Sequence, residues 1–365
     1  MSIELYFDTL LKTAVERGAS DIHINIGSGQ YRINGTIVQS GLGETLKPAD
    51  TAMIAARVLI RARRATPETV KDVLSSLRDE DCSYSAPGIG RFRVNICSQR
   101  GSLALVLRAI SARIPTIGDL GLPAVLADIA MEERGLVLVT GITGSGKTTT
   151  LAAMLEYINC ERGGKIVTIE DPIEFLYQNR KASIVQREVG ADTDSFAKAM
   201  RAAMRQDPDI ILVGEMRDRE TIDAALKAAE TGHLVFSTVH TTDVSKTVMR
   251  IVSYFDLSEE TVIRLRMAEA LRAIISQRLL VRADGKGRVP AVEIMRTTMT
   301  IRDCIENADK ASGLRDYIEK GREQYGMQTF DQHLIELYRS KKINLEEARA
   351  AATSPADFER NLQYT

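Results

Sequence analysis

The sequence predicts an α/β fold in three parts: a small α+β domain, a larger domain built on a parallel sheet, and a helical C-terminal tail. In the first 110 residues, short strand-like segments are mixed with helical stretches. Beyond residue 135, short apolar runs alternate with helical patterns, which is typical of a parallel sheet covered by helices on both faces. The predicted boundaries are 1–110 for the first domain, 111–117 for a linker, 118–297 for the second domain and 298–365 for the helical region.

The first domain is expected to open with a helix over residues 3–17, because its apolar positions recur at helical spacing. Gly18 ends that helix, and Asn34 with Gly35 forms a hairpin-turn signal further on. Pro115 disfavours helix in the linker. The other expected elements are five strands and a helical stretch interrupted near Pro67: Asp21–Ile26, Gln30–Ile33, Thr36–Gln39, Arg91–Ser98, Leu103–Ile110 and residues 49–78.

The second domain is expected to alternate strands with helices before the chain becomes helical only, from about residue 298. The expected elements are, in chain order, Leu136–Thr140, a helix from Lys147, Ile166–Ile169, a helix over 195–206, Ile210–Val213, a helix over 219–230 and Leu234–Thr238. Near the C-terminus, Asn344 and Glu347 have the spacing of a capping box at the start of a helix.

Charge, hydropathy and cysteine content limit the possible functions. The chain has 48 basic and 49 acidic residues, whereas nucleic-acid binding usually needs a basic surplus, so no nucleic-acid partner is expected. The N-terminus lacks the pattern of a signal peptide. No stretch approaches the roughly 20 apolar residues of a membrane helix, so membrane association is expected only through a partner. The scattered cysteines form no C-x-x-C pair, which argues against a zinc ribbon and favours reduced thiols in the cytosol.

A complete phosphate-binding loop is the strongest chemical signal. The segment GITGSGKT, from Gly141 to Thr148, matches G-x-x-x-x-G-K-[ST] in full and lies between an apolar strand and a helical pattern. Glycines let successive backbone N–H groups turn toward a phosphate, and the start of the helix adds partial positive charge. Lys147 would supply a full charge to the β- and γ-phosphates, and the Thr148 hydroxyl would bind Mg²⁺. We therefore expect ATP and Mg²⁺ as cofactors.

Two acidic clusters that follow strand-like segments are candidates for hydrolysis. One contains Glu170, Asp171 and Glu174, and the other ends in Glu215 after an apolar run. Ligands of open α/β sheets sit at the carboxyl ends of parallel strands. Glu215 is therefore expected to contact Mg²⁺ or its water, as a second-strand carboxylate does in P-loop enzymes.

A third strand-like segment carries a histidine at each end, His233 and His240. His240 is expected at the same sheet edge as Glu215, where it could sense the γ-phosphate or bridge the two halves of the site. For a single histidine beside a strand, an ordinary structural role is the alternative interpretation.

These motifs, in this order, resemble those of the type II/IV secretion ATPase superfamily. GITGSGKTTT is similar to its Walker A motif, IEDPIEF to its Asp box, DPDIILVGEMRD to its Walker B motif and AETGHLVFSTVHTT to its His box. Within the superfamily the chain resembles the PilT/PilU family of type IV pilus retraction ATPases. Further segments such as GASDIHINIG, IVQREVGADTDSF and GMQTFDQHL extend this resemblance over nearly the whole chain. It implies a PAS-like N-terminal domain, a RecA-like P-loop ATPase domain, a C-terminal helical tail and a homohexameric ring.

The resemblance also implies roles for individual residues. Glu174 would activate water, Glu215 would hold Mg²⁺ together with Thr148, and His240 would belong to the catalytic group. Arginines of the N-terminal domain would reach the phosphates: Arg91, Arg93 and Arg108. Arg91 and Arg93 alternate along one strand and so share a face; solvated strand positions are the alternative. The implied nucleotide-binding residues are Gly141, Thr143, Gly144, Ser145, Gly146, Lys147, Thr148, Thr149 and His233.

The leading functional hypothesis is a cytoplasmic motor ATPase that powers pilus retraction and twitching motility, peripheral to the inner membrane through a pilus platform protein. The segment Ile301–Ala308 departs from the retraction family's A-I-R-N-L-I-R pattern, and GREQYGMQTFDQ is closer to the PilU branch. An accessory PilU-like paralogue is therefore one alternative. Others are a pilus assembly or type II secretion ATPase, a nucleotide-dependent regulatory subunit and a DNA translocase.

Overall fold

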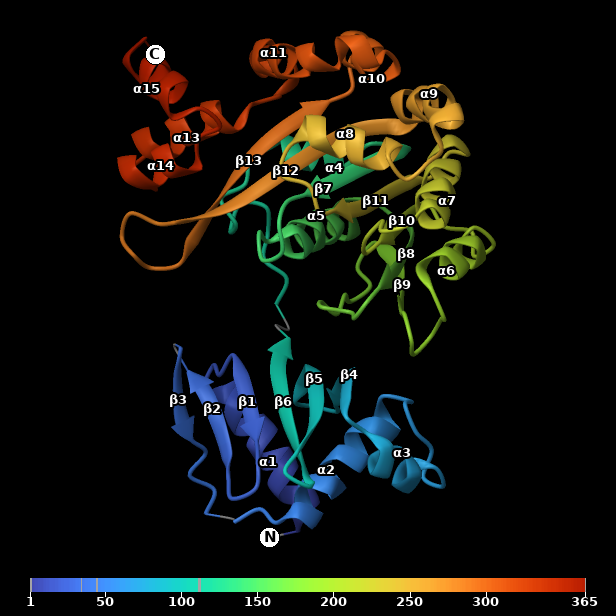
Figure 1. Ribbon diagram of the computed structural model, residues 1–365, viewed down its shortest axis with the longest axis vertical. Coiled ribbons are helices and arrows are strands. Elements are labelled where there is room, and N and C mark those ends of the chain that lie inside the picture. Colours follow the sequence, from blue (N-terminus) through green and yellow to red (C-terminus); the bar gives the residue numbers. More distant parts are fainter. Residues whose placement is uncertain (1, 34, 44, 111–112, 365) are drawn as a thin grey trace. The chain divides into compact units, whose positions relative to one another are not determined.

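Figure 1 shows the computed structural model, which describes residues 2–33, 35–43, 45–110 and 113–364. Two sequence-based predictions lie partly outside these residues: the hairpin turn at Asn34, and the linker at residues 111–112. The chain divides into two compact units. The first comprises Met1–Arg113, Asp171–Leu176 and Glu188–Asp192, and the second comprises Ile114–Glu170, Tyr177–Arg187 and Thr193–Thr365.

The first unit contains a six-stranded sheet with the order β3-β2-β1-β6-β5-β4, in which every neighbouring pair is antiparallel. Its elements are α1 (Ile3–Glu16), β1 (Asp21–Ile24), β2 (Gly29–Ile33), β3 (Thr36–Gln39), α2 (Pro48–Arg61), α3 (Val70–Ser76), β4 (Asp79–Ala86), β5 (Gly90–Gln99) and β6 (Ser102–Ile110). Apolar residues of α1 and α2, such as Leu10 and Val58, form one core with strand residues such as Val94 and Leu107. Because strand side chains alternate between the two faces, Arg91 and Arg93 lie on the face opposite Val94.

The second unit contains a seven-stranded sheet with the order β13-β12-β7-β11-β10-β8-β9. Its elements before the tail are α4 (Val125–Ala130), β7 (Gly135–Thr140), α5 (Lys147–Glu161), β8 (Gly164–Glu170), β9 (Ala182–Glu188), α6 (Phe196–Ala203), β10 (Ile210–Val213), α7 (Arg219–Glu230), β11 (Leu234–Val239), α8 (Val244–Val252), a 3₁₀ turn (Leu257–Glu259), α9 (Glu260–Ala270), β12 (Leu271–Val281) and β13 (Arg288–Arg296). The strands β12, β7, β11, β10 and β8 run parallel, and β13 pairs antiparallel with β12. This confirms the predicted α/β class.

Both faces of this sheet are covered, as the continuous apolar runs indicate. Val137 and Val139 of β7 pack in a core with residues of α4 and α5. Leu136 and Leu138 point to the other face and are at most 1% exposed, and α7 contacts both β7 and β11 there. Strands buried on both faces need no polar alternation, which is why their sequences read as unbroken apolar runs.

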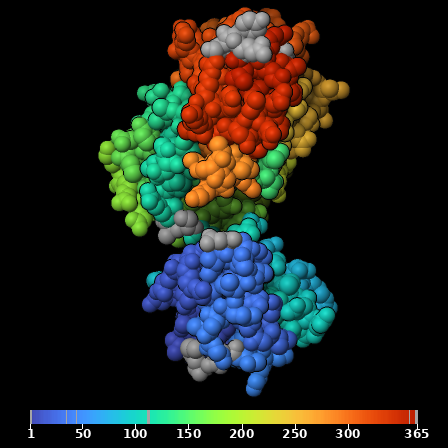
Figure 2. All heavy atoms as spheres, turned by 90° about the vertical axis from the view of Figure 1, so that its left-hand side faces the viewer, coloured from blue at the N-terminus to red at the C-terminus, as the bar shows by residue number. Residues whose placement is uncertain are grey.

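Helices of the C-terminal tail pack against the long β12–β13 hairpin. They are α10 (Met299–Glu306), a 3₁₀ segment (Ala308–Gly313), α11 (Leu314–Lys320), α12 (Arg322–Tyr325), α13 (Phe330–Arg339), α14 (Leu345–Ala351) and α15 (Pro355–Tyr364). Phe330 and Leu334 share a core with Leu280 and Ala291 of the hairpin, and in Figure 2 the red C-terminal helices adjoin the orange hairpin. No helix among the described residues is long and apolar enough to cross a bilayer.

Several element boundaries differ from the predictions. Four strands were not predicted from periodicity, β4, β9, β12 and β13, and α6 ends at Ala203 instead of residue 206. The predicted capping box is only half present: the Asn344 side chain accepts the backbone N–H of Glu347 at 2.8 Å, but the Glu347 carboxylate accepts the N–H of Val281 on β12. That carboxylate therefore joins α14 to the hairpin rather than closing its own helix turn.

A buried carboxyl group lies between the hairpin and α8. Glu293 of β13 is 7% exposed, and its Oε2 accepts the N–H of Val244, the first residue of α8, at 2.9 Å. Burial, together with the nearby Asp243 carboxylate, raises the pKa of Glu293 to about 7. The folded chain therefore holds a proton here at pH values where the unfolded chain has lost it.

We expect this group to make the second unit less stable as pH rises from about 4.5 to about 7, because over that window the folded state binds more protons than the unfolded state. Glu293→Gln keeps an acceptor for Val244 and has no proton to lose. At about pH 8 the thermal midpoint of this variant should be higher than that of wild type, by an amount that corresponds to a difference in the free energy of unfolding on the order of 3 kcal/mol. Near pH 4.5 the two midpoints should be similar. Exposed Glu346→Gln is the control. An identical difference at both pH values would contradict the assignment.

Candidate functional site

The carboxyl ends of the parallel strands bring several predicted residues to one edge of the sheet. The loop from Gly141 to Thr148 follows β7, His240 follows β11 and Glu215 follows β10. β11 lies between β7 and β10 and pairs in parallel with both. Ligands bind at such edges in open α/β sheets, so this edge is the candidate site.

The phosphate-binding loop has the backbone that its glycines permit. Gly144 and Gly146 have φ values of 80° and 88°, in the left-handed region that other residues rarely adopt. Gly146 is the N-cap of α5, so the loop leads directly into the helix start. There, unpaired backbone N–H groups and the helix dipole favour an anion.

Lys147, the first residue of α5, is 8% exposed. Its ammonium donates to the carbonyl oxygens of Gly141 at 2.9 Å and Ile142 at 3.1 Å. The ammonium group therefore lies close to the first residues of the loop, which directly follow β7. This places a cation beside the backbone groups that would receive a phosphate.

Glu215 and His240 are brought together as predicted for residues of neighbouring strands. The Glu215 side chain is 12% exposed, and its Oε2 lies 3.4 Å from Nε2 of His240 and 2.6 Å from Nε of Arg217. Thr238 fixes the two strand ends relative to each other, because its hydroxyl donates to the Gly214 carbonyl at 2.7 Å. The carboxylate therefore has two cationic or hydrogen-bonding neighbours at the edge.

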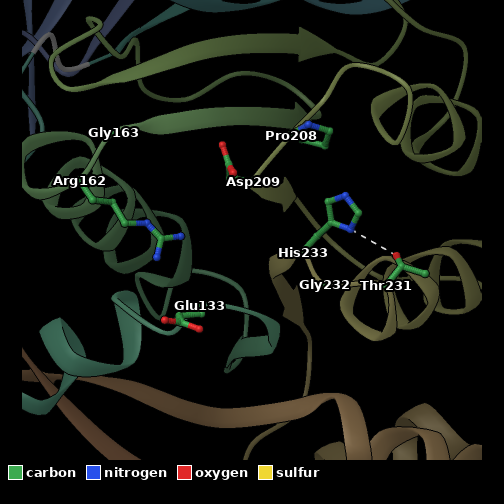
Figure 3. A pocket seen from close by; sticks show the side chains of 8 residues that line it. All are labelled: Glu133, Arg162, Gly163, Pro208, Asp209, Thr231, Gly232 and His233. Carbon is green, nitrogen blue, oxygen red and sulfur yellow. Dashed lines mark hydrogen bonds between the residues drawn. The ribbon is translucent and has the colours of Figure 1, made fainter.

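His233 occupies the opposite edge of the same sheet. It precedes β11, whose six residues separate it from His240, and its Nδ1 lies 3.0 Å from the Ala228 carbonyl oxygen. It lines a separate cavity of about 380 Å³ with Glu133, Arg162 and Asp209 (Figure 3). Within one chain, the structure does not bring His233 to the phosphate-binding loop.

Glu174 belongs to the first unit, in the segment Asp171–Leu176 that follows β8. The backbone N–H of the preceding residue, Ile173, donates to a carboxylate oxygen of Glu188 at 3.1 Å. The same carboxylate forms a buried ion pair with Arg91, whose guanidinium also donates to Ser83 at 2.8 Å. Glu188 therefore holds both a predicted phosphate-binding arginine and the backbone next to the predicted catalytic glutamate.

The other two arginines lie in a cross-strand row on the polar face of the first sheet. Arg93 pairs in register with Arg108, Arg108 with Asp21, and Asp21 with Arg32. Arg108 is 70% exposed, and its Nε donates to Asp21 at 2.9 Å. Although burial opposes ionisation, hydrogen bonds from Ser20 and Arg108 hold the pKa of Asp21 below its usual value. Two guanidinium groups, those of Arg108 and Arg32, thus lie within 4.0 Å of the Asp21 carboxylate.

A cavity of about 430 Å³ opens beside the loop. Its lining includes Gly146, Thr149 and Thr150 of the loop and first turn of α5, and Gln277 and Leu279 of β12. Arg282 and Arg288 of the β12–β13 hairpin add positive charge at its rim. This mixed apolar and cationic hollow has the chemistry of a site for the rest of a nucleotide.

Sequence reasoning missed Glu188, Asp21 and Gln277. The first two form ion pairs with predicted arginines that lie 97 and 87 residues away, and such distant contacts leave no local signal. Gln277 had a weak signal, because the short apolar run Ala273–Ile275 lies just before it. That run could have placed a polar residue at the end of one more parallel strand.

Comparison with known proteins agrees with this geometry. The family described as "Type II/IV secretion system protein" matches residues 1–361. The "Type IV pilus retractation ATPase PilT" of Pseudomonas aeruginosa is 42% identical over 350 residues, which cover 96% of this chain and 98% of that protein. The "Type IV pilus ATPase PilU" of the same organism is 38% identical, over 96% and 90% of the two chains.

Solved structures give the same result. A crystal structure of the pilus retraction motor PilT with bound ADP superposes with a TM-score of 0.86 at 42% identity, covering 97% of this chain and 98% of that one. The Legionella pneumophila ATPase DotB superposes with a TM-score of 0.80 at 29% identity, covering 95% and 94%. From its motifs, its sheet topology and these relatives, the chain is a member of the type II/IV secretion system protein family.

Proposed function

We propose that this chain is a motor ATPase that hydrolyses ATP to power retraction of type IV pili. The observation that carries the proposal is the complete phosphate-binding loop at the end of β7, on the same edge as Glu215 and His240. The near full-length similarity to a pilus retraction ATPase supports the biological role. A chain of two compact units suits a motor ATPase, because in such enzymes the movement of one domain can complete the catalytic site.

The residues of the loop fit the phosphates of ATP. The Ser145 hydroxyl is fully buried and has no hydrogen-bond partner among the described residues, as expected for a group that waits for a ligand. Lys147 would bind the β- and γ-phosphates, and Gly141, Thr143, Gly144 and Gly146 would shape the N–H groups around them. Thr149 lines the adjoining cavity, where the ribose and base would lie.

Thr148 and Glu215 would hold Mg²⁺, which usually keeps several waters and binds through one or two protein oxygens plus phosphates. When bound, the ion would neutralise charge on the phosphates. His240, 3.4 Å from Glu215, would fix the orientation of that carboxylate. It would donate a hydrogen bond through Nε2.

Glu174 would act as the base that orients and deprotonates the attacking water. Arg91, Arg93 and Arg108 would supply positive charge to the phosphates. In the structure Arg91 pairs with Glu188, and Arg108 pairs with Asp21. These ion pairs would have to open before the arginines could bind phosphate. Arg91 and Arg108 would each exchange a carboxylate of the chain for a phosphate of the nucleotide. This exchange would link the bound nucleotide to movement of the N-terminal domain.

Assembly and location complete the proposal. We infer a homohexameric ring in the cytoplasm that acts on an inner-membrane platform protein of the pilus. Membrane association would run through that partner alone, in keeping with the nearly balanced charge of the chain. An accessory role beside a principal motor is the second candidate, because the chain is also 38% identical to PilU over 96% of its length, compared with 42% to PilT.

Steady-state ATP turnover tests the catalytic assignment. Glu174→Gln removes a general base and preserves shape, so its kcat should fall by about a hundredfold or more, whereas exposed Glu346→Gln should match wild type. Binding of ATP should persist in Glu174→Gln. Absence of turnover in both wild type and Glu174→Gln would instead favour a nucleotide-binding regulatory subunit.

Complementation tests the biological role. Expressed in a strain that lacks its retraction ATPase, the chain should restore twitching motility, whereas the Glu174→Gln chain should not. Full ATPase activity of the purified chain without restored motility would contradict the principal-motor assignment and favour the accessory one.

A further inference from the structure

The side chain of Gln277 is built into the phosphate-binding loop from a neighbouring strand. Gln277 lies on β12, one residue beyond Ser276, which pairs in register with Thr140 at the end of β7. Its Nε2 donates to the carbonyl oxygen of Ser145 at 2.7 Å, and its Oε1 accepts from the hydroxyl of Thr150 at 2.7 Å. The residue is 3% exposed, so both bonds are shielded from water.

The partners of this amide determine its orientation. The Ser145 carbonyl can only accept, so it must face the NH₂ end of Gln277. The carbonyl end is then left for Thr150, whose hydroxyl donates. Ser145 lies before Lys147 and Thr150 after it, so one side chain spans the residues that would bind phosphate.

Gln277 also leaves no room for a side chain at two glycines of the loop. A Cβ added to Gly141 would lie 2.4 Å from the Gln277 carbonyl oxygen, and one added to Gly146 would lie 2.8 Å from Nε2. Gly146 additionally has a left-handed φ of 88°. The two ends of the loop are therefore packed against a single residue of β12, by its backbone at Gly141 and by its side chain at Gly146.

We propose that Gln277 is a positioning residue for nucleotide binding, which holds the loop 141–148 in the shape that receives the phosphates. The inference rests on the proposed ATPase function of the same loop. Apparent affinity falls in proportion to the fraction of chains whose site is correctly formed. Loss of Gln277 should therefore weaken ATP binding. At a saturating ATP concentration, bound ATP itself should hold the loop in the shape that binds phosphates.

The test compares KM with kcat. Gln277→Met keeps an unbranched side chain of similar length but loses both hydrogen bonds. Its KM for ATP should rise by about tenfold, as expected for buried polar groups left unpaired, with kcat at saturating ATP within about twofold of wild type. A purely structural residue would lower the fraction of folded enzyme, which reduces apparent kcat and leaves KM unchanged.

Two further variants keep the inference falsifiable. Ser276→Ala removes only the hydroxyl contact to Thr140 on the adjacent position of the same strand, and its KM should equal that of wild type. Thr150→Val removes one of the two Gln277 bonds and should give a smaller rise in KM. An unchanged KM in Gln277→Met would overturn the inference, and so would a rise in KM for Ser276→Ala equal to that for Gln277→Met. If Gln277→Met does not fold, Thr150→Val takes its place, and an unchanged KM in that variant would overturn the inference.

A separate measurement distinguishes failure of this inference from failure of the proposed function. If the wild-type chain shows no turnover, the ATPase assignment fails, and the Kd of a fluorescent ADP analogue then takes the place of KM for the same variants. A rise of about tenfold in Kd for Gln277→Met would support the positioning role. An unchanged Kd would overturn it.

Discussion

The parallel pairing of β7 with β11 on one side and β12 on the other is the constraint on which the candidate site depends. In register, Thr140 at the end of β7 lies beside Val239 and Ser276. The next residues along each strand are therefore the phosphate-binding loop, His240 and Gln277. The two ladders thus set the positions of His240 and Gln277 relative to a loop that lies more than 90 residues before them in the sequence. A slip of one residue on either strand would turn these side chains to the other face.

The parts of this site that depend on local sequence were predictable. Glycine spacing, an apolar strand before the loop and a helix after it are enough to place Lys147, and Glu215 follows from a buried strand of the same kind. The prediction that Glu215 and His240 share an edge needed only the rule that parallel strands end together. His233 illustrates the same rule in reverse, because a strand of six residues necessarily separates its two ends.

The partners of these residues were not predictable from local patterns. Arg91 pairs with Glu188, almost 100 residues away, and Gln277 contacts a loop more than 120 residues before it. The Gln277 contact arises from strand order in a sheet, and the Arg91–Glu188 pair joins strands of two different sheets; periodicity encodes neither. Both unpredicted residues contact predicted site residues: Glu188 pairs with Arg91, and Gln277 donates to the carbonyl of Ser145.

Calorimetric titration of Mg-ADP into the purified chain tests the central claim most directly. The account predicts saturable binding of one nucleotide per chain, with a Kd below about 1 mM, and loss of that binding in Lys147→Ala without loss of the folded structure by circular dichroism. The absence of binding by the wild-type chain, or equal affinity in Lys147→Ala, would show that the loop after β7 is not a nucleotide site and would remove the basis of the motor assignment.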